Sequence, residues 1–256
     1  MKVNNIISIR DKVIIITGTG RGIGRHIALE LAKQSAIVYG TSKRSNFPPP
    51  KYLSKNFFQV KCDITNKLKF KKLCSEIYNK HKKIDVLINN AGVSFPGKEG
   101  KLFPYKFWNK TLAINLTAAF MCSQTVIKYM KKKKQGTIIN MTSINAELAF
   151  PNNPAYAASK GGLKMLGKSL AKDWGKYGIR VNNLGPGYIK TQMNKKSYDD
   201  PKTRKLRKNQ TMLGRWGEVN DLVGICIFLS SDSSNYITGQ DIYVDGGWLA
   251  NGLTKC

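Results

Sequence analysis

A tyrosine and a lysine stand four residues apart in the segment AYAASKGG, as Tyr156 and Lys160. Helical spacing would place both side chains on one face. A free tyrosine has a pKa of ~10, too high for efficient proton exchange at neutral pH, and a neighbouring ammonium lowers it by favouring the phenolate. The pair therefore suits a proton donor and its tuning cation. An amphipathic helix with a partly buried tyrosine and an exposed lysine would give the same spacing.

Two further polar residues could serve the same chemistry. Ser143 lies thirteen residues before Tyr156, at the end of a predicted strand, where parallel sheets gather their ligands. Its hydroxyl could hydrogen-bond a substrate oxygen, or it could satisfy only the backbone. Asn115 stands between Ile114 and Leu116, and an asparagine in apolar surroundings needs a partner. The alternative for Asn115 is a polar helix residue that faces water.

The glycine-rich stretch TGTGRGIG runs from Thr17 to Gly24, after an apolar run and before a helical pattern. It does not fit G-x-G-x-x-G and reads T-G-x-x-x-G-x-G instead. Missing side chains let the backbone approach a pyrophosphate, and the helix N-terminus offers free N–H groups and a positive dipole end. Glycines also form plain tight turns, but a strand before and a helix after favour dinucleotide binding.

Short β-branched runs alternate with helical patterns along the chain. The runs cover residues 12–17, 36–41, 57–63, 85–90, 137–143, 179–186 and 241–246. They are almost continuously apolar, as strands buried on both faces are. The alternation predicts an α/β fold: one doubly wound, Rossmann-like domain over residues 1–256, with a seven-stranded parallel sheet and helices on both faces. Length alone also permits two small domains.

Two regions interrupt this alternation. Residues 42–56 contain three successive prolines, which disfavour a regular crossover helix. Residues 194–217 are polar, basic and long, and we expect them to hold a short helix and to cover the substrate as a lid.

The composition is strongly basic, with 43 Lys and Arg against 15 Asp and Glu and a net charge of +28. This could indicate a polyanion such as nucleic acid. The lysines are spread along the whole chain without a nucleic-acid-binding motif, which favours a solvated surface that attracts small anionic ligands. No run approaches the ~18 apolar residues of a membrane span, and no signal peptide is expected. The five scattered cysteines favour a reduced, cytoplasmic setting, and the lone His26 and His81 indicate no metal site.

Several motifs occur in an order typical of one family. They are TGTGRGIG, NNAG at 89–92, Asn115, Ser143, Tyr156-x-x-x-Lys160 and Pro186-Gly187. Together they resemble the short-chain dehydrogenase/reductase family over about residues 10 to 250. The resemblance implies a homotetramer or homodimer that forms through paired helices and the last strand.

The resemblance also implies catalytic roles. Tyr156 would be the acid/base, and Lys160 would hold the nicotinamide ribose and lower the pKa of the tyrosine. Ser143 would orient the substrate oxygen, and Asn115 would hold a water that links Lys160 to solvent. No member of this set is substituted, which argues against an inactive relative of the family.

The cofactor prediction depends on the end of the second strand. An acid there would bind the 2′-hydroxyl of NAD, but the sequence reads GTSKRS, and Arg21 lies in the glycine turn. Cationic groups suit a 2′-phosphate, so we expect NADP(H), with NAD(H) as the alternative. The resemblance implies a cofactor site made of Gly18, Gly20, Arg21, Gly22, Ile23, Gly24, Thr41, Ser42, Lys43, Asp63, Ile64, Asn90, Ala91, Gly92, Tyr156, Lys160, Pro186, Gly187, Ile189 and Thr191. Within it, Asp63 and Ile64 would clamp the adenine and Thr191 the carboxamide, although Asp63 and Thr191 could equally be helix caps.

Two substrate classes fit the family pattern. The segments GRWGEVNDL and VDGGWLA resemble sugar-acid and polyol dehydrogenases, which favours a sugar acid, sugar derivative or other polar hydroxy or keto compound. The layout also resembles 3-oxoacyl-[acyl-carrier-protein] reductases, in which Lys134 and Lys172 would dock an acidic carrier protein. A different class of function is a non-catalytic nucleotide- or nucleic-acid-binding regulator on the same fold.

Overall fold

Seven parallel strands form one sheet in the order β3-β2-β1-β4-β5-β6-β7. The computed structural model describes residues 7–44, 48, 50–53 and 55–252. The strands are β1 (Val13–Thr17), β2 (Ile37–Ser42), β3 (Phe57–Lys61), β4 (Val86–Asn89), β5 (Gly136–Met141), β6 (Ile179–Pro186) and β7 (Asp241–Val244). Each strand falls on one of the predicted runs, so the seven-stranded parallel sheet is confirmed, with β7 at one edge.

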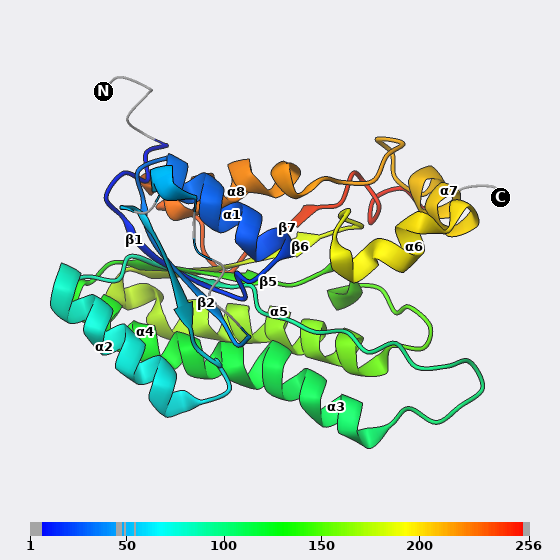
Figure 1. Ribbon diagram of the computed structural model, residues 1–256, viewed down its shortest axis with the longest axis horizontal. Coiled ribbons are helices and arrows are strands. Elements are labelled where there is room, and N and C mark those ends of the chain that lie inside the picture. The colour runs from blue at the N-terminus through cyan, green and yellow to red at the C-terminus, as the bar shows by residue number, and fades with distance from the viewer. Residues whose placement is uncertain (1–6, 45–47, 49, 54, 253–256) are drawn as a thin grey trace.

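Helices cover both faces of this sheet (Figure 1). They are α1 (Gly22–Lys33), α2 (Lys67–His81), α3 (Tyr105–Leu112), α4 (Ala118–Lys133), α5 (Pro154–Trp174), α6 (Lys195–Asp199), α7 (Pro201–Asn209) and α8 (Val223–Ser230). Helices α1 and α8 lie on one face, and α2, α4 and α5 lie on the other. The result is the doubly wound α/β architecture expected from the alternation of strands and helices.

Two apolar cores explain why the strands read as continuous apolar runs. Ile15 and Leu87 belong to the core beneath α2, α4 and α5, whereas Ile14 and Ile88 belong to the core beneath α1 and α8. Successive side chains of a strand point to opposite faces of the sheet. Both faces are covered, so every position in β1 and β4 is buried.

The first irregular region lacks a regular crossover helix, as predicted, and the second contains two short helices where one was expected, while its role as a lid stays a prediction. Between β2 and β3, the only regular structure in the described residues is a 3-10 turn, Lys51–Leu53, in place of a crossover helix. The basic segment after β6 folds into α6 and α7. Asp200 caps α7 by accepting a hydrogen bond from the Thr203 amide at 2.8 Å, and Pro201 occupies the first turn.

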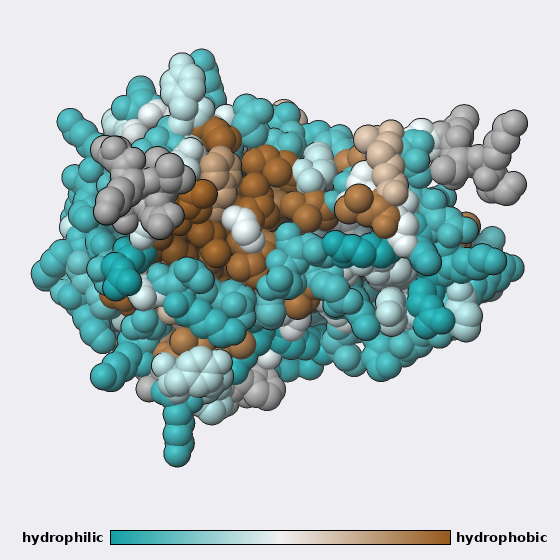
Figure 2. Space-filling view, turned by 90° about the horizontal axis from the view of Figure 1, so that it is seen from above, coloured by the Kyte–Doolittle hydropathy of each residue, from teal (hydrophilic) through white to brown (hydrophobic). Residues whose placement is uncertain are grey.

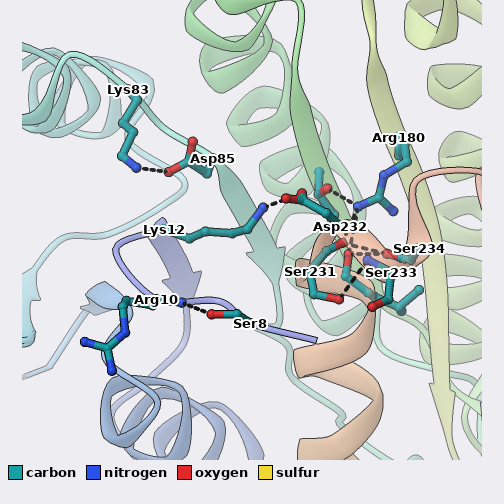
Figure 3. Close-up of polar contacts among 12 residues, drawn as sticks. Ser8, Arg10, Lys12, Lys83, Asp85, Arg180, Ser231, Asp232, Ser233 and Ser234 are labelled. Carbon is teal, nitrogen blue, oxygen red and sulfur yellow. Dashed lines mark hydrogen bonds and ion pairs between the residues drawn. The ribbon is translucent and has the colours of Figure 1, made fainter. Parts of the chain in front are cut away.

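Polar contacts connect the segments at the N-terminal ends of the strands (Figure 3). Lys12 pairs with Asp232 at 2.8 Å, and Lys83 pairs with Asp85 at 3.2 Å. The Arg180 guanidinium donates at 2.8 Å to the Thr137 hydroxyl, and also to the main-chain oxygens of Leu229 in α8 and Ser231 just after α8. Lys12, Lys83 and Arg180 therefore bind partners within the chain. The predicted site residues lie at the other end of the sheet, where the parallel strands end.

An apolar area lies over α1 and α8 on the outer surface (Figure 2). In α8, Ile225, Ile227 and Phe228 are only partly buried. No helix in the described part of the chain is long and apolar enough to cross a membrane.

Candidate active site

Tyr156 and Lys160 lie one turn apart near the start of α5, as the spacing predicts. Lys160 retains only 4% of its exposure, and its ammonium nitrogen lies 5.6 Å from the centroid of the Tyr156 ring. Tyr156 is half-buried. The alternative of a solvent-exposed lysine on an amphipathic helix is therefore wrong.

The Lys160 ammonium is held by the main chain. It donates a hydrogen bond of 2.6 Å to the carbonyl oxygen of Met141, the last residue of β5. Burial lowers the pKa of Lys160 to about 8. A cation is thus fixed at the end of a central strand, where ligands of parallel sheets bind.

Ser143 contacts both the backbone and Tyr156. Its hydroxyl accepts a hydrogen bond from the Asn145 amide at 3.2 Å, so the backbone-satisfying interpretation is also correct. Burial raises the pKa of Tyr156, and the hydrogen bond with Ser143 partly offsets that rise. The expected net lowering of the Tyr156 pKa is therefore wrong for the chain by itself. The cost of burying a phenolate dominates, and the Lys160 ammonium points to Met141.

Asn115 sits in a π-helical turn, Ala113–Thr117, that leads into α4, and it is buried. Its side-chain oxygen accepts from the Val93 amide at 2.9 Å, and its amide nitrogen donates to the Val93 carbonyl and the Ser159 hydroxyl, both at 3.0 Å. The predicted need for a partner is confirmed, and the solvent-facing alternative is wrong. A Cβ at Gly92 would lie 3.5 Å from the Asn115 oxygen and 3.7 Å from the Lys160 nitrogen, so these groups meet beyond the end of β4.

The glycine turn is locked onto the segment after β4. Gly18 has a positive φ of 77°, and a Cβ there would lie 2.7 Å from the Cα of Ala91. A Cβ at Gly24 would lie 2.2 Å from the side-chain nitrogen of Asn90, which donates at 2.8 Å to the Thr17 carbonyl. These glycines are thus required by packing within the chain. Asn90 and Ala91 position the turn, a role that the sequence pattern does not reveal.

The start of α1 fits a phosphate group. Arg21 occupies the N-cap without a side-chain capping bond, and the first turn contains no acid. Gly22 has a φ of 62°, and a Cβ there would meet nothing within 4 Å. The first amide groups of a helix have no intrahelical acceptor, so they can donate to an anion here. Ile23 is partly buried and packs against the core beneath α1.

The glycine turn meets the end of β2 at Gly20, where a Cβ would lie 2.7 Å from the Ser42 hydroxyl. Arg21 and Lys43, the neighbours of these two residues, are both exposed. Lys43 pairs with Asp63 at 2.8 Å, which links the second and third strand ends. Two cations therefore flank the position where a cofactor's adenosine ribose is expected.

Three other predicted cofactor residues, Thr41, Ile64 and Ile189, are buried. Thr41 is fully buried, and its carbonyl accepts from the Gly18 and Thr19 amides, both at 2.9 Å. Ile64 and Ile189 are buried within the two cores. Their side chains therefore shape the site instead of lining an open surface.

The end of β3 carries Asp63, whose carboxylate accepts from the Thr65 amide at 3.1 Å. Burial opposes ionisation of Asp63, but the hydrogen bonds from Lys43 and Thr65 prevail and its pKa is lowered. The interpretation of Asp63 as the helix cap is wrong. Asn66 caps α2 by accepting from the Lys69 amide at 3.0 Å.

The segment after β6 turns sharply past the edge strand. The Gly187 amide, which follows Pro186, donates to the Val244 carbonyl at 3.0 Å, and a Cβ at Gly187 would lie 2.7 Å from the Cα of Asp245. Thr191 stands at the N-cap of a 3-10 turn, but its side chain makes no capping bond. The hydroxyl of Thr191 is therefore not committed to a capping role.

Sequence reasoning missed Tyr188, which follows Pro186-Gly187 directly. Its ring packs against Trp248 at 4.8 Å, Trp216 at 5.4 Å and Phe150 at 6.1 Å between centroids. It is also close enough to Tyr156 for its charge to raise the pKa of that phenol. The only sequence signal is an aromatic residue immediately after the predicted cofactor turn.

Comparisons with known proteins show the family of the chain. The model of a family described as "Enoyl-(Acyl carrier protein) reductase" matches residues 18–249. The fold and the Ser–Tyr–Lys arrangement define an oxidoreductase of the Rossmann type, and the chain belongs to the short-chain dehydrogenase/reductase family.

The chain is similar to several curated and solved members of this family. It is 36% identical over 250 residues to the 2-dehydro-3-deoxy-D-gluconate 5-dehydrogenase of Bacillus subtilis, with 95% of this chain and 96% of that protein covered. It is 35% identical to the 5-keto-D-gluconate 5-reductase of Escherichia coli K12, with 96% and 98% covered. A gluconate 5-dehydrogenase from Burkholderia cenocepacia, crystallised in complex with NADP and tartrate, has a TM-score of 0.87 and 31% identity, with 96% and 98% covered.

Proposed function

We propose that the chain interconverts a secondary alcohol and a ketone on a sugar acid, with NADP(H) as the cofactor and Tyr156 as the acid/base. The observation that carries this proposal is the grouping of the buried Lys160 with Tyr156 and Ser143, whose hydroxyl acts on the pKa of that tyrosine, beside a glycine turn with free helix amides. The names of the similar proteins support the same reaction class and substrate class.

The residues around the glycine turn suit NADP(H). Arg21 and Lys43 would bind the 2′-phosphate beside Ser42, where an NAD enzyme would carry an acid. The amides at the start of α1 would bind the pyrophosphate. When bound, the nicotinamide supplies or accepts the hydride. The NADP complex of the Burkholderia cenocepacia enzyme supports this cofactor.

The chemistry of the chain's own residues follows from the site. Because burial raises the pKa of Tyr156, its phenol is protonated at neutral pH and can donate a proton to the oxygen of the ketone. Ser143 would donate a second hydrogen bond to that oxygen. Lys160 would hold the nicotinamide ribose and return a proton to Tyr156, and Asn115 would hold a water on the route to solvent.

A sugar acid suits the charge of the protein, because a net charge of +28 attracts anions. The carrier-protein alternative is less well supported. Lys172 lies sixteen residues beyond Tyr156 on α5, which at 1.5 Å per residue is about 24 Å along the helix. Lys134 lies just before β5, at the end of the sheet where the strands begin. Within one subunit, neither cation lies near the reacting phenol. The complete Ser–Tyr–Lys set argues against a non-catalytic regulator.

Assembly and location belong to the same proposal. A homotetramer or homodimer would use the edge strand β7 and the start of α5, where a Cβ at Gly161 would meet nothing within 4 Å. Gly162, in contrast, packs against Leu116 of the same chain. A cytoplasmic location agrees with four free, buried cysteines among the described residues.

A substrate screen that follows NADPH absorbance tests the proposal. It should include 5-keto-D-gluconate, other keto sugar acids, a neutral ketose and an acetoacetyl thioester. We expect turnover of at least one keto sugar acid and little turnover of the thioester. Turnover of the thioester alone would replace the proposed substrate class with the carrier-protein class.

A further inference from the structure

The basic segment after β6 docks onto the aromatic group formed by Tyr188, Trp216, Trp248 and Phe150. The indole N–H of Trp216 donates at 3.1 Å to the Arg204 carbonyl in α7, and Asn251 donates at 3.0 Å to the carbonyl of Gln210, just after α7. Helix α7 is therefore fixed against this aromatic group.

This docking brings the Arg207 side chain over Tyr188. The central guanidinium carbon lies 4.1 Å from the centroid of the Tyr188 ring and 5.7 Å from that of Trp216. At 4.1 Å the guanidinium is in contact with the ring, a geometry that cation–π attraction favours. The aromatic contact holds the cation in place while its N–H donors point along its own plane.

Arg207 differs from its neighbour Arg215 in its partners. Arg215 makes a bidentate ion pair with Asp221, with N···O distances of 2.7 and 2.9 Å. Within the described residues, no carboxylate pairs with Arg207 and only aromatic rings hold it. A half-buried guanidinium without a carboxylate has the donor pattern that binds a carboxylate bidentately.

The position of Arg207 relates it to the reacting centre. Tyr188 contacts Arg207 and influences Tyr156, and Phe150, which lies between Ser143 and Tyr156 in the chain, packs edge-on against Tyr188 at 6.1 Å. Arg207 thus contacts a ring whose charge acts on the proton donor. A substrate whose ketone lies at Tyr156 would extend toward this cation.

We propose that Arg207 binds the carboxylate of the sugar acid and makes the enzyme selective for acidic over neutral substrates. This inference rests on the proposed function, since it assigns the group that recognises the acid end of that substrate. In this role Arg207 is a specificity-determining residue, and Tyr156 and Ser143 act at the other end of the molecule.

The test compares 5-keto-D-gluconate with its neutral amide in the wild type and in Arg207→Gln. Loss of a charge-assisted bidentate contact should raise KM for the acid about 10- to 100-fold with little change in kcat. The kcat/KM for the amide should stay within about twofold, since the amide cannot form that ion pair. Arg207→Lys should restore only part of the affinity, because an ammonium lacks the planar fork.

Arg204→Gln is the matched control, because Arg204 lies three residues earlier on α7. Its central guanidinium carbon lies 5.6 Å from the centroid of a different ring, that of Tyr198. We expect it to leave KM for both substrates unchanged. An equal loss for acid and amide in Arg207→Gln, or no loss for either, would overturn the inference.

A binding measurement separates this inference from the proposed function. With NADPH present, the dicarboxylate tartrate should raise the Tm of the wild type, and Arg207→Gln should lose this rise. Equal shifts in both proteins, or no shift in the wild type, would contradict a carboxylate site at Arg207. Failure of the wild type to reduce any keto sugar acid would instead contradict the proposed function, whatever the tartrate result.

Discussion

The ammonium nitrogen of Lys160 lies 2.6 Å from the carbonyl oxygen of Met141, at the end of β5. This contact fixes a buried cation beneath Tyr156, and its pKa falls to about 8 because burial disfavours the charged form. A main-chain oxygen compensates only part of the lost hydration. The arrangement is therefore expected to serve function at a cost in stability.

Replacing Lys160 with methionine should stabilise the chain without cofactor. The folded-state pKa of about 8 lies below the ordinary value of 10.5, so the folded state binds fewer protons than the unfolded state between these values. Stability from this group thus rises with pH from about 8 to 10.5, and the cost is full below pH 8. Lys160→Met should raise the free energy of unfolding by about 1–3 kcal/mol at pH 7 and by less at pH 10.

Urea unfolding at both pH values measures this effect. Lys172→Met is the control, because Lys172 is an exposed lysine on the same helix. A Lys160→Met variant that is less stable than the wild type at pH 7 would show that the buried ammonium is stabilising.

The raised pKa of Tyr156 predicts opposite pH dependences for the two directions of the reaction. Ketone reduction needs the protonated phenol, which persists through neutral pH because burial raises its pKa. Alcohol oxidation needs the phenolate, so its kcat/KM should rise with pH across the range of about 6 to 10. Initial rates in both directions test this, and an oxidation rate that is highest in acid would contradict it.

Arg21 should discriminate between the two cofactors. Arg21→Ala removes a charge-assisted contact to the 2′-phosphate and should weaken NADPH binding about tenfold. NADH, which lacks that phosphate, provides the control and should bind almost unchanged. Cofactor fluorescence titration gives both dissociation constants. Equal weakening for NADPH and NADH would place Arg21 against the pyrophosphate instead.

The close packing of the glycine turn predicts a strong position dependence for alanine substitutions. Gly24→Ala would bring a methyl group to 2.2 Å from the Asn90 side chain and 2.6 Å from the Gly18 carbonyl, and should destabilise by about 1–3 kcal/mol. Gly224, in α8, meets nothing within 4 Å, so Gly224→Ala should stabilise by about 0.5–1 kcal/mol. Similar effects of the two substitutions in thermal unfolding would contradict this account of the turn.

The fold was predictable because its signal is repeated along the chain. The central strands β1, β4 and β5 are buried at every position, so apolar runs such as VIIIT indicate strands covered on both faces. The three successive prolines within residues 42–56 likewise indicate the absence of a regular crossover helix. The prediction that Tyr156 and Lys160 lie on one helix is also confirmed, since α5 contains both residues.

Contacts between distant segments were not predictable in the same way. No local pattern shows that Asn90 donates to the Thr17 carbonyl, or that Arg207 reaches Tyr188. The pKa of Tyr156 was mispredicted for a related reason. The spacing to Lys160 reveals a neighbouring cation, but the depth of burial and the choice of Met141 as its partner appear only in three dimensions.

The turnover of Tyr156→Phe with NADPH and 5-keto-D-gluconate tests the central claim most directly. Removing a positioned acid should lower kcat about 10²- to 10⁴-fold, while the dissociation constant for NADPH stays within about threefold of the wild-type value. Wild-type turnover in this variant, with the cofactor still bound, would show that another group supplies the proton.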